Sequence, residues 1–350
     1  MRLLVTGGAG FIGSEIVKAG LARGWSIRVL DSLRTDVHGA SPDQDSRIQF
    51  VHGDVTDAQT VARALAGIDV VCHQAAKVGL GVDFSDAPDY VASNDFGTAV
   101  VLAGMAAAQI PRLVIASSMV VYGEGAYSGR GGITRPAPRR VADLNAGQFD
   151  PLDDDGTPLT PELITEDSPL DPRNVYAITK LSQEYLATAW ARSTGGTVAA
   201  LRYHNVYGPG MPQNTPYAGV ASLFRSSIER GQAPTVFEDG KQRRDFVHVR
   251  DVASANIAAI DYTADATAGT ARAFNVGSGD VHTIGEVARL LSLNSRGLAP
   301  VVTGEYRLGD VRHITASSAR LKEELGWAPS VSFEEGMREF ATAPLRAAVS

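Results

Sequence analysis

A tyrosine and a lysine one helical turn apart, together with a pair of serines, are the side chains of this sequence best suited to proton transfer. Tyr176 and Lys180 stand four residues apart in a segment with helical spacing, so they share one helix face. An ammonium beside a phenol favours the phenolate and lowers the phenol pKa from its usual value of about 10. The phenolate can then remove a proton from a hydroxyl while hydride leaves the same carbon, and Ser118, after Ser117, can hydrogen-bond the reacting oxygen. Because Tyr-x-x-x-Lys is also common on surface helices, the interpretation needs a hydride acceptor elsewhere in the chain.

The first residues of the chain predict a binding site for a dinucleotide, which can act as the hydride acceptor. A short apolar run at 3–5 predicts a buried strand, three glycines follow as G-x-x-G-x-x-G, and an apolar pattern with helical spacing comes next. Gly7 allows a tight turn out of the strand, Gly10 lets the backbone approach a pyrophosphate, and Gly13 permits close helix–strand packing. The free N–H groups at the start of the helix then face the phosphates, so the stretch predicts a dinucleotide site.

An acidic residue after the second predicted strand supports this prediction. Asp31 follows the apolar run 27–30 and lies about 18 residues after Gly13, close to the spacing of a carboxylate that accepts hydrogen bonds from the adenosine ribose. A carboxylate there repels a 2′-phosphate, so we expect NAD rather than NADP, although nearby Arg34 weakens that preference.

The alternation of apolar runs and amphipathic stretches predicts an α/β protein with a Rossmann-like, doubly wound parallel sheet. Strands are expected at 3–5, 27–30, 48–51, 69–72, 113–116 and 198–201. We expect an NAD-binding domain at 1–200 and a smaller C-terminal α/β domain, mainly substrate-binding, at 201–345, with some of its segments returning to the main sheet. Ligands bind beyond the carboxyl ends of such strands.

Residues 123–172 interrupt the first domain. They are rich in glycine, proline and aspartate and lack periodicity. Loops of this length are usually functional or disordered. A surface insertion that acts as a lid and a partly disordered excursion both remain open.

Composition narrows the class of protein. The chain of 350 residues has a formal net charge of −7, which argues against nucleic-acid binding. Cys72 is the single cysteine, so disulfides and cysteine-based metal sites are excluded, and we expect no metal site. No apolar run approaches the roughly 20 residues of a membrane span. A first strand starting at residue 2 leaves no room for a signal peptide, so we expect a cytoplasmic protein without membrane partners.

Ten ordered motifs resemble those of the extended short-chain dehydrogenase/reductase family, in its NDP-sugar epimerase/dehydratase branch. They are TGGAGFIG at 6–13, GDV at 53–55, HQAA at 73–76, N-x-x-GT at 94–98, SSMVVYG at 117–123, Y-x-x-x-K at 176–180, RYHNVYGP at 202–209, RDFVHV-x-DVA at 244–253, FNVG at 274–277 and GD at 309–310. They span nearly the whole chain.

The resemblance implies roles for individual residues. Tyr176 is the base, Lys180 anchors the nicotinamide ribose and Ser118 holds the reacting hydroxyl. The residues implied to bind NAD are Gly7, Gly10, Phe11, Ile12, Gly13, Asp31, Asp54, Val55, Ala75, Ala76, Asn94, Ser117, Tyr176, Lys180, Tyr203 and Val206. Those implied to bind a nucleotide-sugar substrate are Ser118, Tyr176, Asn205, Gln242, Arg244, Arg307 and Asp310.

The absence of two residues that dehydratases use indicates the type of reaction. Related 4,6-dehydratases carry Thr-Asp-Glu where this chain has Ser118-Met119-Val120, so the acid and base for elimination of water are missing. We therefore expect a 4-epimerase of a dTDP- or UDP-linked hexose, which oxidises C4 to a 4-keto intermediate and returns hydride to the opposite face. A reductase of 4-keto sugars with exchangeable NAD(P)H and a catalytically dead sensor are the alternatives.

Two further expectations come with the resemblance. A homodimer is implied, through helices near 88–108 and 174–194. His204 and Gln74 depart from the phenylalanine and leucine common in the family, which affects the expected sugar specificity. His204 either touches the ligand or is a hydrogen-bonded buried histidine.

Overall fold

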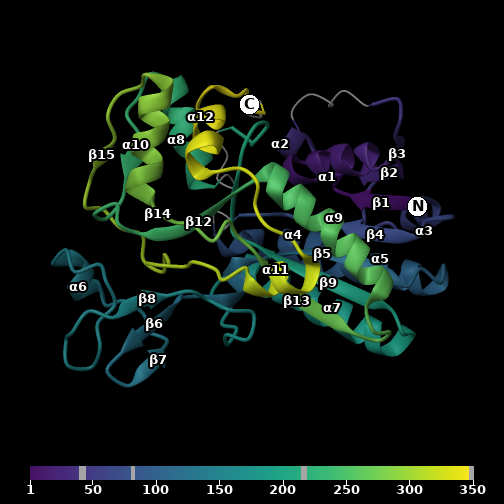
Figure 1. The fold of residues 1–350 in the computed structure, drawn as a ribbon, viewed down its shortest axis with the longest axis horizontal. Coiled ribbons are helices and arrows are strands. Elements are labelled where there is room, and N and C mark those ends of the chain that lie inside the picture. The colour runs from purple at the N-terminus through teal and green to yellow at the C-terminus, as the bar shows by residue number, and fades with distance from the viewer. Residues whose placement is uncertain (39–44, 80–82, 214–218, 347–350) are drawn as a thin grey trace.

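A parallel β-sheet forms the centre of the molecule. The computed structural model describes residues 1–38, 45–79, 83–213 and 219–346, and within them this sheet has seven strands in the order β13-β9-β5-β4-β1-β2-β3, with every neighbouring pair parallel (Figure 1). The strands are β1 (Arg2–Thr6), β2 (Ser26–Asp31), β3 (Gln49–His52), β4 (Val70–His73), β5 (Arg112–Ser118), β9 (Thr197–Tyr203) and β13 (Ala271–Val276). The predicted fold class is confirmed, and β13 is a C-terminal segment that returns to the main sheet.

Helices cover both faces of this sheet because their apolar stripes need burial. One face carries α1 (Phe11–Ala22), α9 (Val249–Asp265) and α11 (Ala319–Leu325), and the other carries α3 (Ala58–Leu65), α5 (Gly97–Ala107) and α7 (Val175–Thr194). The short α2 (Thr35–His38) follows β2. Asn174 starts α7 by accepting the Ala177 N–H at 2.8 Å, which fixes where the helix carrying Tyr176 and Lys180 begins.

The helical stretch predicted near 87–108 is not one regular helix. It consists of η1 (Phe84–Asp86), α4 (Ala87–Tyr90), a π-helical segment η2 (Val91–Phe96) and α5. A π-helical turn widens the backbone, and such turns concentrate at functional sites. Here η2 contains Asn94, which is fully buried.

The C-terminal part adds a smaller α/β unit beside the sheet. Its strands are β10 (Asn205–Tyr207), β11 (Thr235–Val236), β12 (Arg243–His248), β14 (Val281–Thr283) and β15 (Val301–Val302), and its helices are α8 (Val220–Glu229), α10 (Ile284–Ser295) and α12 (Phe333–Thr342). Phe246, Phe333 and Phe340 are at the centre of its own hydrophobic core. The domain limits at 200 and 201 stay a prediction.

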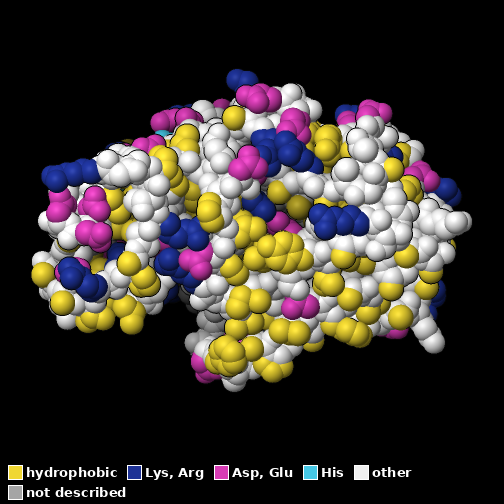
Figure 2. All heavy atoms as spheres, turned by 90° about the horizontal axis from the view of Figure 1, so that it is seen from below, with side chains coloured by type: hydrophobic (Ala, Val, Ile, Leu, Met, Phe, Trp, Pro, Cys, Tyr) yellow, Lys and Arg dark blue, Asp and Glu magenta, His cyan; other side chains and the backbone are white. Residues whose placement is uncertain are grey.

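The surface carries an apolar region on one face. Seen from below, hydrophobic side chains gather on the part of the molecule to which α7 belongs (Figure 2). Phe84, Phe96, Ile178 and Tyr185 are among the exposed large hydrophobic residues, with Tyr185 exposed to 61%. Among the described helices, none combines the length and the apolar character needed to cross a bilayer.

The insertion at 123–172, which had no predicted periodicity, has regular structure. After η3 (Met119–Tyr122) it forms an antiparallel sheet of β6 (Ala126–Gly129), β7 (Gly132–Thr134) and β8 (Thr160–Glu162), with α6 (Val141–Asn145) between β7 and β8. Sequence reasoning missed these strands because they read AYSG, GIT and TPE and so lack the apolar run that reveals the equally short strands of the main sheet.

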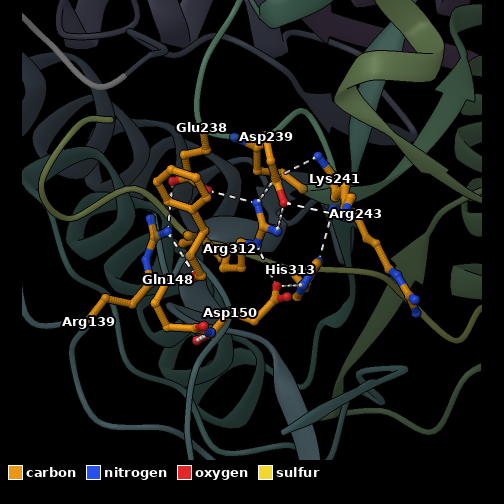
Figure 3. A network of polar contacts seen from close by, with 12 residues as sticks. Arg139, Gln148, Asp150, Glu238, Asp239, Lys241, Arg243, Arg312 and His313 are labelled. Carbon is orange, nitrogen blue, oxygen red and sulfur yellow. Dashed lines mark hydrogen bonds and ion pairs between the residues drawn. The ribbon is translucent and has the colours of Figure 1, made fainter. Parts of the chain in front are cut away.

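Ion pairs around the buried Arg312 connect the insertion to the C-terminal unit (Figure 3). Arg312 is completely buried and donates to Asp150 at 2.8 Å, to Glu238 at 2.8 Å and to Asp239 at 2.7 Å. Arg139 of the insertion reaches the same Glu238 carboxylate at 2.7 Å. Asp150 and Arg139 come from the insertion and the other three residues from the C-terminal unit, so these ion pairs hold two segments that are far apart in the sequence.

Removing the arginine at the centre of this network should destabilise the fold. Arg312→Met leaves the carboxylate of Glu238, itself almost fully buried, with one cation instead of two, so we expect a loss of about 3 kcal/mol in the free energy of unfolding in urea. Arg130→Met is the matched control, because Arg130 pairs with Asp155 in the same insertion but is exposed to 79%. Equal urea midpoints for the two variants would contradict the assigned role.

Candidate active site

The first glycine turn fits as tightly as its spacing predicts. Gly7 has φ +67°, and a Cβ on Gly13 would lie 2.2 Å from the carbonyl oxygen of Gly7. Only glycine lets α1 start this close to β1. Gly10 at the N-cap has no side chain to cap the helix, so the N–H groups of its first turn are available to an anion.

A cavity of about 420 Å³ opens at this turn and follows the carboxyl ends of the strands. It brings together most of the residues predicted from the sequence, although these come from seven separate segments. The predicted residues that line it are Gly7, Gly10, Phe11, Ile12, Gly13, Asp31, Asp54, Val55, Ala75, Ala76, Ser117, Ser118, Tyr176, Lys180, Tyr203, Asn205 and Val206. Parallel strands explain the convergence, because their carboxyl ends meet at one edge of the sheet.

Asp31 is held in place at the end of β2. Its carboxylate accepts the N–H of Ala9 at 3.0 Å and that of Leu33 at 2.9 Å, and His38 Nε2 lies 3.3 Å away. Burial opposes ionisation, but these hydrogen bonds outweigh it and lower the pKa of Asp31 below its usual value. The cavity therefore has a fixed negative charge at this point, which suits two ribose hydroxyls and disfavours a phosphate.

The catalytic candidates meet at the junction of α7 and β5. Lys180 is buried and its Nζ donates to the carbonyl of Ala116 at 2.9 Å. The same Nζ lies 6.0 Å from the centre of the Tyr176 ring. Ser118 ends β5 and is also buried. Phenol, ammonium and hydroxyl thus border one part of the cavity.

The pKa of Tyr176 differs from the sequence-based expectation. Burial raises it to about 12, and the Ser118 hydroxyl acts in the opposite direction. Burial also lowers the pKa of Lys180 to about 7, while the carboxylates of Glu184 and Asp95 raise it. The expectation of a phenol acidified by Lys180 is therefore not met here, because desolvation of the phenolate dominates and the ammonium is bonded to Ala116.

A buried network behind these residues was missed by sequence reasoning. Glu184, one turn beyond Lys180 on α7, accepts the Ser117 hydroxyl and receives Arg202 Nε at 2.9 Å and Nη2 at 2.8 Å. Arg202 Nη1 also donates to the Tyr122 hydroxyl at 2.9 Å. The signal was available, because Glu184 is four residues after Lys180 and eight after Tyr176 and so shares their helix face.

Asn94 does not line the cavity, contrary to its implied role as a cofactor contact. Its Oδ1 accepts the Lys77 N–H at 2.8 Å, and its Nδ2 donates to the Lys77 carbonyl at 3.0 Å and to Thr179 Oγ1 at 2.9 Å. Lys77 belongs to the cavity wall and Thr179 to α7. Asn94 therefore supports the cavity from behind.

Four residues predicted to bind substrate also lie outside this cavity. The guanidinium of Arg244 donates to the carbonyls of Arg243, Val311 and Arg312 at 2.8, 2.6 and 2.9 Å. Arg307 lies over the Phe237 ring at 5.1 Å, Gln242 donates to the Phe237 carbonyl at 3.0 Å, and the Asp310 carbonyl accepts Arg139. They form a separate group beside the insertion, and their contact with a substrate stays a prediction.

The cavity's chemistry fits a dinucleotide. One end has the glycine turn and the start of α1 for a pyrophosphate, Asp31 offers a carboxylate to a ribose, and Lys180 and Tyr176 stand at the opposite part. A Cβ on Gly7 would lie 2.7 Å from the Ala75 nitrogen, so backbone alone shapes this end. Fold and site together define a nicotinamide-dependent enzyme of the short-chain dehydrogenase type.

Comparison with known proteins gives the family. A family model described as "NAD dependent epimerase/dehydratase family" matches residues 3–277, and the chain belongs to this family. It is 34% identical over 352 residues to the dTDP-L-rhamnose 4-epimerase of Burkholderia thailandensis, with 97% of this chain and 94% of that protein covered. The resemblance stated from the motifs is confirmed.

Solved structures agree with this assignment. The UDP-glucose 4-epimerase of Thermus thermophilus in complex with NAD is 30% identical, with a TM-score of 0.75 and coverage of 97% of this chain and 98% of that one. The UDP-glucose 4-epimerase of Thermotoga maritima with UDP-glucose is 28% identical, with a TM-score of 0.76 and 97% of each chain covered. NAD is accordingly the cofactor that the cavity accommodates.

The pH dependence of turnover should reveal the influence of Glu184 on Lys180. Its carboxylate raises the pKa of Lys180, so Glu184→Gln lowers that pKa further. The protonated amine of Lys180 adds to the positive charge that favours the phenolate, so activity should fall as pH rises through the pKa of Lys180. We expect the alkaline limb of kcat to move to lower pH by about one unit.

The control for this measurement is Glu323→Gln, at an exposed glutamate of α11, which should leave the profile unchanged. Because Arg202 also loses its charged partner in Glu184→Gln, the folded fraction is determined at each pH. An unshifted alkaline limb in a folded Glu184→Gln enzyme would refute the assignment.

Proposed function

We propose that this protein is an NAD-dependent nucleotide-sugar 4-epimerase that acts on a dTDP- or UDP-linked hexose. The observation that carries the proposal is the meeting of Ser118, Tyr176 and Lys180 at the dinucleotide cavity, where Met119 and Val120 follow Ser118. These two side chains offer no acid or base for elimination of water, which disfavours a dehydratase. The relatives named as 4-epimerases support the same reaction.

The chain's own residues account for the proton and for the position of the sugar. Tyr176 takes the proton of the C4 hydroxyl and later returns it, and the Ser118 hydroxyl hydrogen-bonds the same oxygen. Bound NAD supplies the acceptor for the C4 hydride and, when oxidised, a positive charge that favours the phenolate. Lys180 adds to that effect whenever its amine is protonated. Between the two hydride transfers the 4-keto hexose must rotate to present its opposite face. The hydrogen bonds between the protein and the hexose must therefore break and form again.

A reductase of 4-keto sugars would use the same three residues. The difference is whether the cofactor stays bound, because an epimerase recycles it within each turnover whereas a reductase exchanges it. We propose the epimerase, and release of the cofactor separates the two. The single free cysteine, Cys72, is buried and compatible with a reducing cytoplasm, where we propose that the enzyme works.

The proposal is tested by purifying the protein, denaturing a sample and assaying the supernatant for NAD(H). We expect bound NAD, and conversion of dTDP-L-rhamnose or UDP-glucose to its C4 epimer without added cofactor. Tyr176→Phe should lose about 10²- to 10⁴-fold in kcat and keep its NAD, because only the proton acceptor is removed. Tyr185→Phe, at an exposed tyrosine of the same helix, is the control. Turnover only with added NAD(P)H would replace the epimerase by the reductase.

We further propose that two copies of the chain associate through α7 and the α4–α5 region. Ile178 and Tyr185 lie on one face of α7, and the side chains of both are more than half exposed. Phe96, also exposed, ends the neighbouring π-helical segment η2. An apolar region of this kind on a soluble protein marks an interaction surface (Figure 2).

Sedimentation velocity tests the association. The wild-type protein is expected to sediment as a dimer and Tyr185→Glu as a monomer, because a carboxylate cannot be buried unpaired in an apolar interface. Leu293→Glu, at an exposed leucine of α10 away from this face, should remain dimeric. A wild-type monomer, or a dimeric Tyr185→Glu, would contradict the proposal.

A further inference from the structure

His204 is a buried polar residue whose side chain has no hydrogen-bond partner among the residues that the structure describes. It is exposed to only 4%, and within the described residues neither ring nitrogen has a partner. Of the two readings that the sequence left open, a hydrogen-bonded buried histidine is therefore not what the structure contains. Leaving buried donors and acceptors unpaired is costly, so such a group calls for an explanation.

The position of His204 relates it to the reacting part of the cavity. The backbone N–H of His204 donates to the Val276 carbonyl at 3.0 Å. This bond continues the pairing of β9 with β13 by one residue. The residue before it, Tyr203, is the register partner of Ser118 on β5. His204 therefore lies one step beyond the level of Ser118, and it lines the cavity together with Ser118 and Tyr176.

The imidazole of His204 and the phenol of Tyr203 lie on opposite faces of the sheet. The Tyr203 hydroxyl lies 3.0 Å from Gln74 Oε1 and accepts a hydrogen bond from Asn256 Nδ2 at 2.8 Å, on the α9 side of the sheet. Side chains alternate along a strand, so His204 points to the other side, as Arg202 does toward Glu184 of α7. This is the side from which α7 presents Tyr176.

The imidazole is neutral in this position. Burial lowers the pKa of His204 to about 3, and the charge of Arg244 acts in the same direction. A neutral imidazole has one N–H donor and one nitrogen acceptor, which matches a hydroxyl, since a hydroxyl can both accept and donate. A phosphate offers only acceptors, so it can pair only with the nitrogen that carries the proton, whereas a hydroxyl can pair with either nitrogen.

Its neighbour has a second unpaired group. The Oδ1 atom of Asn205 is also buried and has no partner in the described part of the chain, and Asn205 lines the same cavity. Two consecutive residues of the cavity lining thus carry polar atoms that have no partner among the described residues. A sugar ring, which carries several hydroxyls in a fixed arrangement, is a ligand that could satisfy both.

We propose that His204 is a specificity-determining residue whose neutral imidazole hydrogen-bonds a ring hydroxyl of the hexose, beside the carbon held by Ser118 and Tyr176. The inference rests on the proposed function for the identity of the ligand as a nucleotide-linked hexose. It goes beyond that function in assigning sugar discrimination to one side chain.

Two substitutions separate a polar contact from packing. His204→Phe keeps a planar ring but removes both nitrogens, and His204→Gln keeps one donor and one acceptor. Because His204→Phe replaces unpaired polar atoms with apolar ones, it should unfold at the same temperature as the wild type or a higher one. A histidine needed for the fold would instead destabilise the protein on replacement.

The first readout is ligand-induced stabilisation, which does not depend on turnover. Thermal unfolding of the NAD-loaded protein is followed with dTDP, dTDP-L-rhamnose, UDP and UDP-glucose. His204→Phe should keep its NAD content and the shift caused by dTDP or UDP alone, and lose the additional shift caused by the hexose. His204→Gln should retain most of that addition.

The second readout is kinetic. His204→Phe should raise KM for the preferred sugar by about tenfold or more, and His204→Gln by only a few-fold. With deoxy-hexose analogues, wild type and His204→Phe should converge for the one analogue that lacks the contacted hydroxyl. This pattern would identify the hydroxyl, and a loss of packing would not produce it.

The outcomes are distinguishable. Identical hexose-dependent shifts and KM values for wild type and His204→Phe would overturn the inference and leave the epimerase proposal intact. Loss of NAD from His204→Phe would also overturn it, by placing the imidazole on the cofactor. If the wild type epimerises no sugar, the proposed function fails, and the thermal shifts still decide whether His204 contacts the hexose.

Discussion

One buried ion pair sets the geometry on which the site depends. Glu184 of α7 holds Arg202 of β9 through two hydrogen bonds and also accepts the Ser117 hydroxyl of β5. A helix and two neighbouring strands are thereby fixed relative to one another. The phenol of Tyr176 and the hydroxyl of Ser118 come from these same elements, so their separation is set by this contact. A buried pair with several hydrogen bonds to each partner gives a unique arrangement more than it gives stability.

Burial is the second constraint, and it acts on both titrating groups. It raises the pKa of Tyr176 to about 12 and lowers that of Lys180 to about 7. The protein alone therefore disfavours the ionised form of both side chains. Tyr176 therefore becomes an effective base only when oxidised NAD is bound and adds its positive charge. Without the cofactor, the phenol stays protonated. Asp31 and the glycine turn determine where that dinucleotide lies, and thus connect cofactor binding with proton transfer.

The parts of the structure that were predictable from sequence are those governed by local rules. The glycine spacing at 7–13, the acid at Asp31 and the Tyr176–Lys180 pair each follow from one backbone or side-chain requirement, and the strands of the main sheet are long enough to show apolar runs. The strands of the insertion contain glycine, serine, threonine, proline and glutamate and show no such run. The Arg312 network could not be foreseen, because it joins residues about 160 positions apart through contacts that no local pattern encodes. The pKa of Tyr176 was mispredicted because the spacing reveals the neighbouring amine but not the desolvation.

The central claim is that hydride leaves C4 of the sugar and returns to the same molecule within one binding event. The most direct test is to incubate the protein, without added cofactor, with a nucleotide-hexose carrying deuterium at C4 and to analyse the epimer by mass spectrometry and NMR. The account predicts that the epimer retains the deuterium at C4, because the cofactor that accepts the hydride stays bound throughout the turnover. Epimer that carries protium at C4 would contradict it, because the hydrogen would then have come from solvent or from a second reductant.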